Sequence, residues 1–429
     1  MSSAARKSFL PSTAIAVTAA LLLSGCGALG LGKEGDVTLK LVAPDYGTNR
    51  ATSTEPYWQE LAKSFEAANP GIKVEVEVVS WTDIDTRVAE LIKNNKSPDL
   101  VQTGGYADHV AAGRLYPAGD VLTIETQANM LASIAQAGQV LGSQYGIPFT
   151  TSSRLFVYNK AIFEKAGITT PPATWDEMAK AAKKIKEKVP GVTPYALPLG
   201  PEEAQAEGLI WATGGGGGFA DDTGTYSINS DANQKTFDWL RTSLVTPGLT
   251  YKDPGTVSRA AAFEEFAAGK VAMLNGHPQL ALNADKAGIP YGTAPLLRKD
   301  AQGKPPSMGV ADWMMAFKAN GHRAEIKKFL THVYQKENVI KFASMYNLLP
   351  VTQDAREEMA GSGHNIKPFL DALTTARFYP YGETSWDRVS GLLKKQLGGA
   401  VKNDGQGALS ALQGAAVEAA EQSRRTSGG

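Results

Sequence analysis

VTLKLVAPDYGTNRATSTEPYWQELAKSFEAANPGIKVEVEVVS, residues 37–80, contains in order a strand, a helix and a second strand. Residues 37–43 are rich in β-prone side chains, and residues 74–79 alternate between apolar and charged ones. Between them, Trp58, Leu61 and Phe65 recur at helical spacing, and Thr54 and Pro56 suit the start of a helix. Asn69-Pro70-Gly71 ends this helix before the second strand begins.

The pattern continues toward the C-terminus with a second helix around residues 84–92 and a third strand at 98–102. This β-α-β-α-β order predicts an open α/β sheet with helices on both faces. Ligands of such sheets bind outside the carboxyl ends of the strands, which here are residues 44–48 and 102–106. Farther along, Thr174 and Glu177 predict a capped helix through Lys188, and residues 406–423 predict an amphipathic helix.

Composition limits the classes of function. The 429 residues exceed the usual size of one domain, so we expect two. There are 43 basic and 43 acidic residues, and this balance argues against nucleic acid as a partner. The only cysteine, Cys26, cannot form an internal disulfide.

The N-terminus has the pattern of an export signal. Arg6 and Lys7 precede an uncharged apolar run over residues 9–23, which is shorter than a membrane span requires. Residues 23–26, Leu-Ser-Gly-Cys, resemble the bacterial lipobox, which implies that Cys26 is the lipidated first residue of the mature chain. We therefore expect a signal peptide over 1–25 and a lipid anchor with a Gly-rich flexible tether over 26–36, outside the cell membrane.

Six segments, in order along nearly the whole mature chain, resemble the extracellular solute-binding lipoproteins of ABC importers, in the maltose- and oligosaccharide-binding branch. They are residues 65–74, 97–101, 156–160, 172–177, 266–273 and 347–351. The resemblance implies a periplasmic-binding-protein-like fold of type II, with two α/β lobes and a ligand cleft between them. It places lobe one at 37–147 plus 293–348 and lobe two at 148–292 plus 349–429. It further implies a monomer without cofactor or metal, whose partners are a carbohydrate solute and the membrane permease, with hinge closure as the signal to the transporter.

A sugar site needs aromatic faces for stacking and planar or hydroxyl groups for hydrogen bonds. Trp386 matches a position where the family places a stacking aromatic. Asp312 lies in an apolar segment, where its carboxyl group needs a partner. Glu202 has an alternative role, which is to stabilise the start of a helix. His277 has a structural role as its alternative. The candidate ligand-binding residues are Asp45, Tyr46, Gln102, Thr103, Tyr106, Thr150, Thr151, Ser152, Glu202, Asn275, His277, Asp312, Trp313 and Trp386.

Other aromatic residues fit packing: Trp81 and Trp175 fit helix starts, and Trp58 and Trp239 fit apolar helix faces. The glycines at 214–218 lack the Gly-Lys-Ser/Thr of a phosphate loop. A glycerophosphodiester or another non-sugar solute is an alternative ligand, but a phosphate prefers a bidentate Arg and the candidates include few cations. A carbohydrate-active surface enzyme is a further alternative, which a pair of catalytic carboxylates would favour. We expect a binding protein rather than an enzyme.

Overall fold

The computed structural model describes residues 36–47, 50, 52–81, 83–221, 223–303, 305–361 and 366–427. Residues 36–429 form one compact unit, which is described here by itself. Cys26 and the predicted signal peptide lie outside the described residues. No helix among the described residues is both long enough and apolar enough to cross a membrane.

The first sheet has five strands in the order β2-β1-β3-β11-β6. Its parallel strands β1, β2 and β3 alternate along the chain with helices α1 and α2, which confirms the predicted β-α-β-α-β order. β11 runs antiparallel to both β3 and β6. The strands are β1 (Val37–Asp45), β2 (Ile72–Ser80), β3 (Leu100–Thr103), β6 (Ile147–Ser153) and β11 (Gly309–Ala316).

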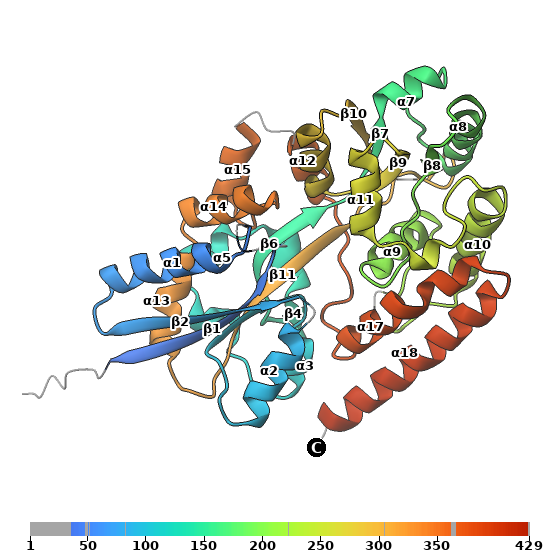
Figure 1. The fold of residues 1–429 in the computed structure, drawn as a ribbon. Coiled ribbons are helices and arrows are strands. Elements are labelled where there is room, and N and C mark those ends of the chain that lie inside the picture. The colour runs from blue at the N-terminus through green and yellow to red at the C-terminus, as the bar shows by residue number, and fades with distance from the viewer. Residues whose placement is uncertain are drawn as a thin grey trace, which may run out of the picture. The chain divides into compact units, whose positions relative to one another are not determined.

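The second sheet has four strands in the order β10-β7-β9-β8. They are β7 (Leu155–Asn159), β8 (Thr193–Tyr195), β9 (Val271–Gly276) and β10 (Tyr291–Ala294). A separate hairpin pairs β4 (Gln139–Val140) with β5 (Ser143–Gln144). The chain thus builds two sheets, each flanked by helices (Figure 1).

The chain passes from the first sheet to the second through one residue, Arg154, which lies between β6 and β7. It returns through the segment between β10 and β11. Beside the first of these passages, Thr151 and Leu349 form an isolated antiparallel bridge. The predicted division into 37–147 plus 293–348 and 148–292 plus 349–429 stays a prediction.

Eighteen α-helices are assigned within the described residues. The first nine are α1 (Glu55–Ala68), α2 (Ile84–Lys93), α3 (Ala107–Ala111), α4 (Ala118–Val121), α5 (Ile124–Asn129), α6 (Ala132–Ala137), α7 (Lys160–Lys165), α8 (Trp175–Lys188) and α9 (Ala204–Gly214). The others are α10 (Asp231–Leu240), α11 (Arg259–Ala267), α12 (Pro278–Lys286), α13 (Arg323–Val333), α14 (Lys336–Tyr346), α15 (Gln353–Gly361), α16 (Lys367–Leu373), α17 (Trp386–Gln396) and α18 (Gly405–Ser427). The long C-terminal helix α18 packs beside α17 (Figure 1).

Two helix starts show how local sequence sets these boundaries. At α8, the Thr174 hydroxyl accepts a hydrogen bond from the Glu177 backbone N–H, and the Glu177 carboxylate accepts from the Thr174 backbone N–H, so the predicted capping box is confirmed. At α1, the predicted helix forms, but the Thr54 hydroxyl does not cap it. That hydroxyl donates instead to the carbonyl oxygen of Pro44, at 2.9 Å, and so ties the helix to the end of β1.

Candidate functional site

Three predicted residues, two at the ends of β1 and β3 and one inside β11, form one chain of hydrogen bonds. The Gln102 side-chain amide, at the end of β3, donates to the Tyr46 hydroxyl at 2.7 Å. The Tyr46 hydroxyl, just beyond β1, donates to Asp312 Oδ2 in β11 at 2.6 Å. Two acceptors of this chain are unused: Asp312 Oδ1 has no partner among the described residues, and the buried Gln102 Oε1 has none. The carboxyl ends of the parallel strands β1 and β3 therefore meet Asp312 of the antiparallel strand β11, and together they have spare hydrogen-bonding capacity.

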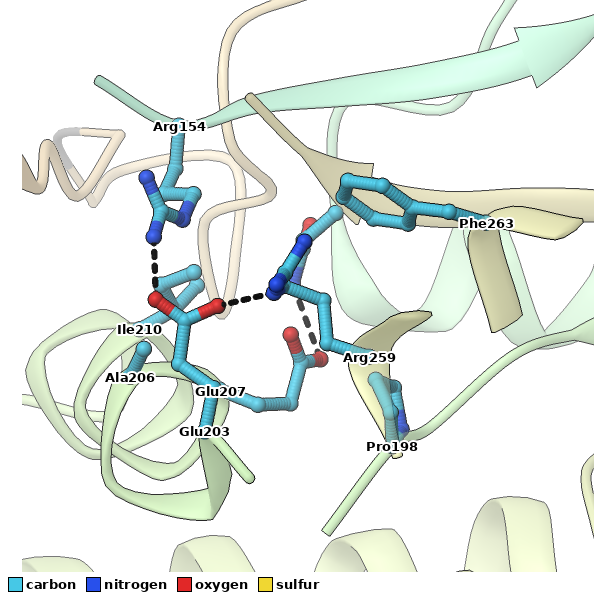
Figure 2. A pocket seen from close by; sticks show the side chains of 9 residues that line it. Arg154, Pro198, Glu203, Ala206, Glu207, Ile210, Arg259 and Phe263 are labelled. Atoms are coloured by element: carbon cyan, nitrogen blue, oxygen red, sulfur yellow. Dashed lines mark hydrogen bonds and ion pairs between the residues drawn. The ribbon is translucent and has the colours of Figure 1, made fainter. Parts of the chain in front are cut away.

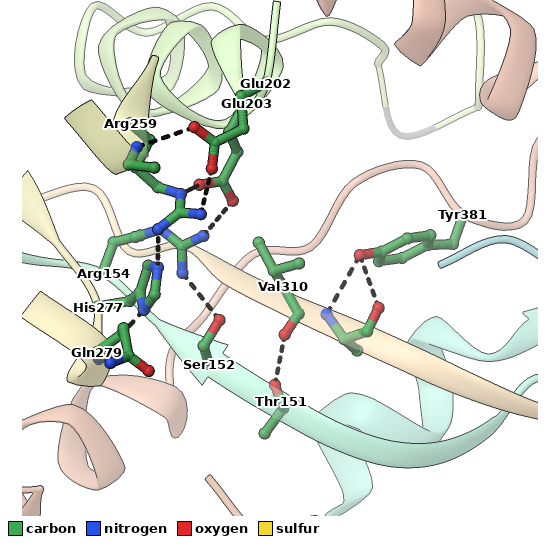
Figure 3. Close-up of polar contacts among 12 residues, drawn as sticks. Thr151, Ser152, Arg154, Glu202, Glu203, Arg259, His277, Gln279, Val310 and Tyr381 are labelled. Carbon is green, nitrogen blue, oxygen red and sulfur yellow. Dashed lines mark hydrogen bonds and ion pairs between the residues drawn. The ribbon is translucent and has the colours of Figure 1, made fainter. Parts of the chain in front are cut away.

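The backbone at Asp312 explains why its side chain reaches Tyr46. A β-bulge lies between Asp312 and Trp313 in the pairing of β11 with β6. The Tyr381 hydroxyl satisfies the backbone next to the bulge, because it donates to the Ala311 carbonyl at 3.0 Å and accepts from the Ala311 N–H at 3.2 Å (Figure 3). The bulge is thus held by a side chain of the C-terminal segment.

Trp81 lies beside this polar chain, contrary to the prediction that it packs inside. Its side chain follows β2 and is 39% exposed. Its ring meets Tyr46 edge to face, with centroids 5.3 Å apart. An exposed indole next to unused acceptors is the combination of an apolar face and polar edge groups that binds sugar rings.

A second polar cluster, which we call the arginine–glutamate chain, runs through Arg154, Glu203, Arg259 and Glu202 (Figure 3). Glu203 lies between the two cations: its Oε1 is 2.5 Å from Arg154 Nη2 and its Oε2 is 2.6 Å from Arg259 Nε. Glu202 pairs with Arg259 Nη2 and accepts from the Ala260 N–H at the start of α11. Glu202 therefore lies at the start of a helix, as its alternative role predicts, but the helix is α11 and not α9, which follows Glu202 in sequence.

His277 and Asn275 border this chain. His277 Nε2 is 2.9 Å from Arg259 Nη1, and its Nδ1 accepts from the Gln279 N–H at the start of α12. Burial, followed by the charges of Arg154 and Arg259, lowers the pKa of His277 well below its usual value. The Asn275 amide donates to Glu207 Oε1 at 3.0 Å. His277 is therefore a neutral ring held by a helix start and a guanidinium.

Electrostatics link the two clusters. Burial raises the pKa of Asp312 to about 7, although the hydrogen bond from Tyr46 acts to lower it. The nearby charge of Glu203 raises this pKa, and that of Arg154 lowers it. Burial acts to raise the pKa of Glu203 as well, but the charges of Arg154 and Arg259 outweigh it and hold that pKa below its ordinary value. Asp312 of the first sheet thus lies within electrostatic reach of the arginine–glutamate chain.

Four predicted residues take other roles. Asp45 binds its own loop, accepting from the Gly47 and Thr54 N–H groups. The Thr103 hydroxyl donates to Asp85 at 3.0 Å. Tyr106 and Trp313 are fully buried against each other, with ring centroids 5.2 Å apart. Neither side chain has exposed surface in this structure, and contact of Tyr106 and Trp313 with a ligand stays a prediction.

The predicted Thr/Ser patch is buried in β6. The hydroxyls of Thr150 and Thr151 donate to the backbone oxygens of Leu349 and Val310. Ser152 accepts from Arg154 Nη1 at 2.9 Å, so it contacts the arginine–glutamate chain (Figure 3). Trp386 at the start of α17 is 3% exposed, and its ring lies 5.1 Å from that of Tyr379. Its ring packs on Tyr379 in this structure, and its stacking on a ligand stays a prediction.

Next to Trp386, Asp387 reaches the loop that follows β3. A Cβ on Gly105 would lie 2.2 Å from Asp387 Oδ2, so this approach requires glycine. Burial of the carboxyl, then the charges of Asp108 and Asp85, raise the pKa of Asp387 to about 7. The C-terminal segment therefore contacts the first sheet at the same edge as Gln102.

Sequence reasoning missed Arg154, Glu203, Glu207 and Arg259. The candidates themselves include few cations, but Arg154 contacts Ser152, and Arg259 contacts Glu202 and His277. One signal was available for Arg154, since it follows directly on the predicted Thr/Ser patch. Arg259 gave none, because its partners lie 57 and 18 positions away in sequence.

Within the described part of the chain, no group of three or more His, Cys, Asp or Glu side chains could hold a metal ion. The polar groups of both clusters instead offer donors and acceptors for hydrogen bonds with a solute.

Three relatives illustrate the comparisons with known proteins. A binding protein of Brucella abortus (strain 2308) is 27% identical over 379 residues, which cover 86% of this chain and 90% of that protein. The sn-glycerol-3-phosphate-binding periplasmic protein of Rhizobium meliloti (strain 1021) is 25% identical over 325 residues, 71% of this chain and 74% of that protein. The crystal structure of an ABC transporter solute-binding protein from Thermotoga lettingae, bound with α-D-tagatose, superposes with a TM-score of 0.72 at 21% identity.

That superposition covers 91% of this chain and 100% of the Thermotoga chain, and it confirms the predicted two-lobe, type II fold. The family model described as bacterial extracellular solute-binding protein matches residues 51–340, more than half of the sequence. This family is one of binding proteins, and it confirms the resemblance inferred from the six segments. The chain therefore belongs to the family of bacterial extracellular solute-binding proteins.

Proposed function

We propose that this protein is the lipid-anchored receptor of an ABC importer and that it binds a mono- or oligosaccharide and delivers it, unchanged, to the membrane permease. The receptor acts as a monomer and holds the solute between its two lobes, beside the Tyr46–Gln102–Asp312 chain. Cys26 carries the lipid, so membrane association should be lost in a Cys26→Ser variant.

The observation that supports a neutral, hydroxyl-rich solute is the balance of charge around the polar clusters. Arg154 and Arg259 are the cations that a phosphate would use, but each is paired with Glu203, and Arg259 also with Glu202. A phosphate would have to displace these carboxylates, which costs the ion pairs already formed. Sugar hydroxyls can add to the unused acceptors of Asp312 and Gln102 without separating any charge.

A glycerophosphodiester or glycerol phosphate is the alternative solute, since a relative is named for sn-glycerol 3-phosphate. Lys394 of α17 also favours it, because this lysine acts on the pKa values of Glu203 and Asp312 and forms no ion pair with another described residue. Phosphate-bearing solutes therefore belong in the same test.

The test is calorimetric titration of the purified full-length chain in mild detergent with sugars, polyols, amino sugars and glycerophosphodiesters. We expect one class of sugar to bind with micromolar affinity, about 8 kcal/mol, and to be recovered unchanged by chromatography. At pH 8, above the value of about 7 to which burial raises the pKa of Asp312, the Asp312→Asn variant should bind that sugar about 10-fold or more weakly. A hydrogen bond to a charged group contributes about 1.5–3 kcal/mol.

Asp371→Asn is the matched control, since Asp371 lies on the surface of α16 and pairs only with Lys367. Its affinity should equal that of the unmodified chain. Heat on titration with phosphate-bearing compounds alone would reject the sugar proposal, and conversion of the sugar into a product would reject the assignment as a receptor.

A further inference from the structure

A small cavity of about 10 Å³ lies behind the arginine–glutamate chain (Figure 2). Its polar lining comes from Arg154, Glu203, Glu207 and Arg259, and Ile210 and Phe263 add apolar wall. This volume holds about one water-sized group. The rim reaches solvent, since the side chains of Glu203 and Arg259 are 17% and 25% exposed.

Glu207 of α9 supplies an unused acceptor here. Its side chain is buried, and its Oε1 accepts three hydrogen bonds, from the Tyr195 hydroxyl at 3.0 Å, the Trp211 indole at 2.8 Å and the Asn275 amide at 3.0 Å. Its Oε2 has no partner among the described residues, and it is not fully enclosed by protein. Figure 2 shows Glu207 among the lining residues, together with Glu203, Arg154 and Arg259. This oxygen is therefore free to accept a hydrogen bond from a group placed in the cavity.

The same cavity offers donors. A guanidinium has five N–H groups. Among the described residues, Arg154 uses its N–H groups on Ser152 and Glu203, and Arg259 contacts Glu202, Glu203 and His277. N–H groups therefore remain on both guanidinium groups for an oxygen placed in the cavity.

Only one kind of group can bond both to the acceptor of Glu207 and to the guanidinium donors that line the cavity. An anionic oxygen would face the carboxylate of Glu203, whose pKa the charges of Arg154 and Arg259 hold below its ordinary value. An ammonium would face two guanidinium groups and has no acceptor atom of its own. A neutral hydroxyl donates to Glu207 Oε2 and accepts from an arginine. The chemistry of the cavity is therefore that of a single hydroxyl oxygen, which a solute or an ordered water can supply.

We propose that the cavity is a subsite for one hydroxyl group of the bound sugar and that Glu207 is the residue that determines specificity for that hydroxyl. This rests on the function proposed above. The receptor then distinguishes sugars that differ at a single ring position, through a carboxylate on α9 that lies apart from the Tyr46–Gln102–Asp312 chain.

The test compares the best-binding sugar with its series of monodeoxy analogues, by calorimetry on the full-length chain in detergent. We expect one analogue to bind about 10-fold or more weakly than the parent at pH 8, from the loss of a charge-assisted hydrogen bond. This pH lies above the value of about 7 to which burial raises the pKa of Glu207. In Glu207→Gln the difference between the parent and that analogue should fall to within about threefold, while the penalties for the other deoxy positions persist. Glu187→Gln, an exposed glutamate on α8, is the matched control and should leave the whole series unchanged.

Two results would overturn the subsite while leaving the function intact. If every deoxy analogue binds the unmodified chain as tightly as the parent, the cavity holds only a water. If Glu207→Gln weakens the parent and all analogues by the same factor, Glu207 is merely structural. Should Glu207→Gln fail to fold, Ala206→Val fills the cavity without changing Glu207 and should reduce the parent's affinity to that of the weak analogue. Absence of binding by any sugar would reject the proposed function and the subsite together.

Discussion

Trp81 and Trp386 differ in how much of the indole is accessible, although both lie at helix starts. Trp81 is 39% exposed beside Tyr46, whereas Trp386 is 3% exposed and packs on Tyr379. We expect Trp386→Ala to lower the free energy of unfolding by about 3–5 kcal/mol, because it removes a buried aromatic side chain. Trp81→Ala should cost little stability but weaken sugar binding several-fold, because a stacking face is lost.

Denaturant unfolding and calorimetric titration of the two variants separate these effects. A Trp81→Ala variant that binds every sugar normally would mean that the exposed indole has no part in recognition. A Trp386→Ala variant with unchanged stability would contradict the packing described for α17.

The helices show how far local sequence determines an element. At α8, Thr174 and Glu177 form a complete capping box, and the sequence pattern alone predicted it. At α1, the helix begins where predicted, but the Thr54 hydroxyl bonds the Pro44 carbonyl, ten positions away. Apolar spacing and a proline in the first turn sufficed to begin α1, so the capping interaction was not needed for its placement.

This difference gives a prediction for α8. Thr174→Ala removes the acceptor for the Glu177 N–H and should lower the free energy of unfolding by about 1 kcal/mol. Thr174→Ser keeps the acceptor and is the matched control, with stability close to that of the unmodified chain. Guanidinium unfolding curves of both variants measure the effect, and equal stabilities would argue against a stabilising cap.

The titration of Asp312 should make the free energy of unfolding of the whole molecule depend on pH. Burial raises the pKa of Asp312 from 3.8 to about 7 in the folded chain. A folded-state pKa above the unfolded value means that the protonated form stabilises the fold. This stabilisation is complete below pH 3.8 and is lost as the pH rises through about 7.

Asp312→Asn stays neutral at every pH, so its stability relative to the unmodified chain should increase between pH 4 and pH 7 and then level off. Unfolding free energies of the two proteins at pH 4.5, 6 and 8 measure the difference. Asp371→Asn, at an exposed carboxyl, controls for the general effect of removing an acid. A difference that does not change with pH would show that Asp312 titrates as in the unfolded chain.

Much of the candidate site could be placed from sequence, because it depends on the ends of parallel strands. Tyr46 and Gln102 follow β1 and β3, and the β-α-β-α-β order alone brings such ends to one edge. The prediction was wrong for Trp81, which was assigned to packing but is exposed. Trp313 is buried in this structure, and its contact with a ligand stays a prediction. A helix-start pattern describes the backbone near a residue, and it does not say which neighbours cover the side chain.

The sequence by itself predicted the first three strands with α1 and α2, and the capped helix α8, because periodicity and capping depend on residues a few positions apart. Six short segments carried the resemblance to the family. Tertiary structure decided which polar groups meet. Tyr46 and Asp312 are 266 positions apart, and a bulge stabilised by Tyr381 sets the side chain of Asp312. The arginine–glutamate chain and the cavity at Glu207 likewise join residues of β9, α9, α11 and the single-residue passage at Arg154. Such contacts depend on the packing of distant elements, which no local pattern records.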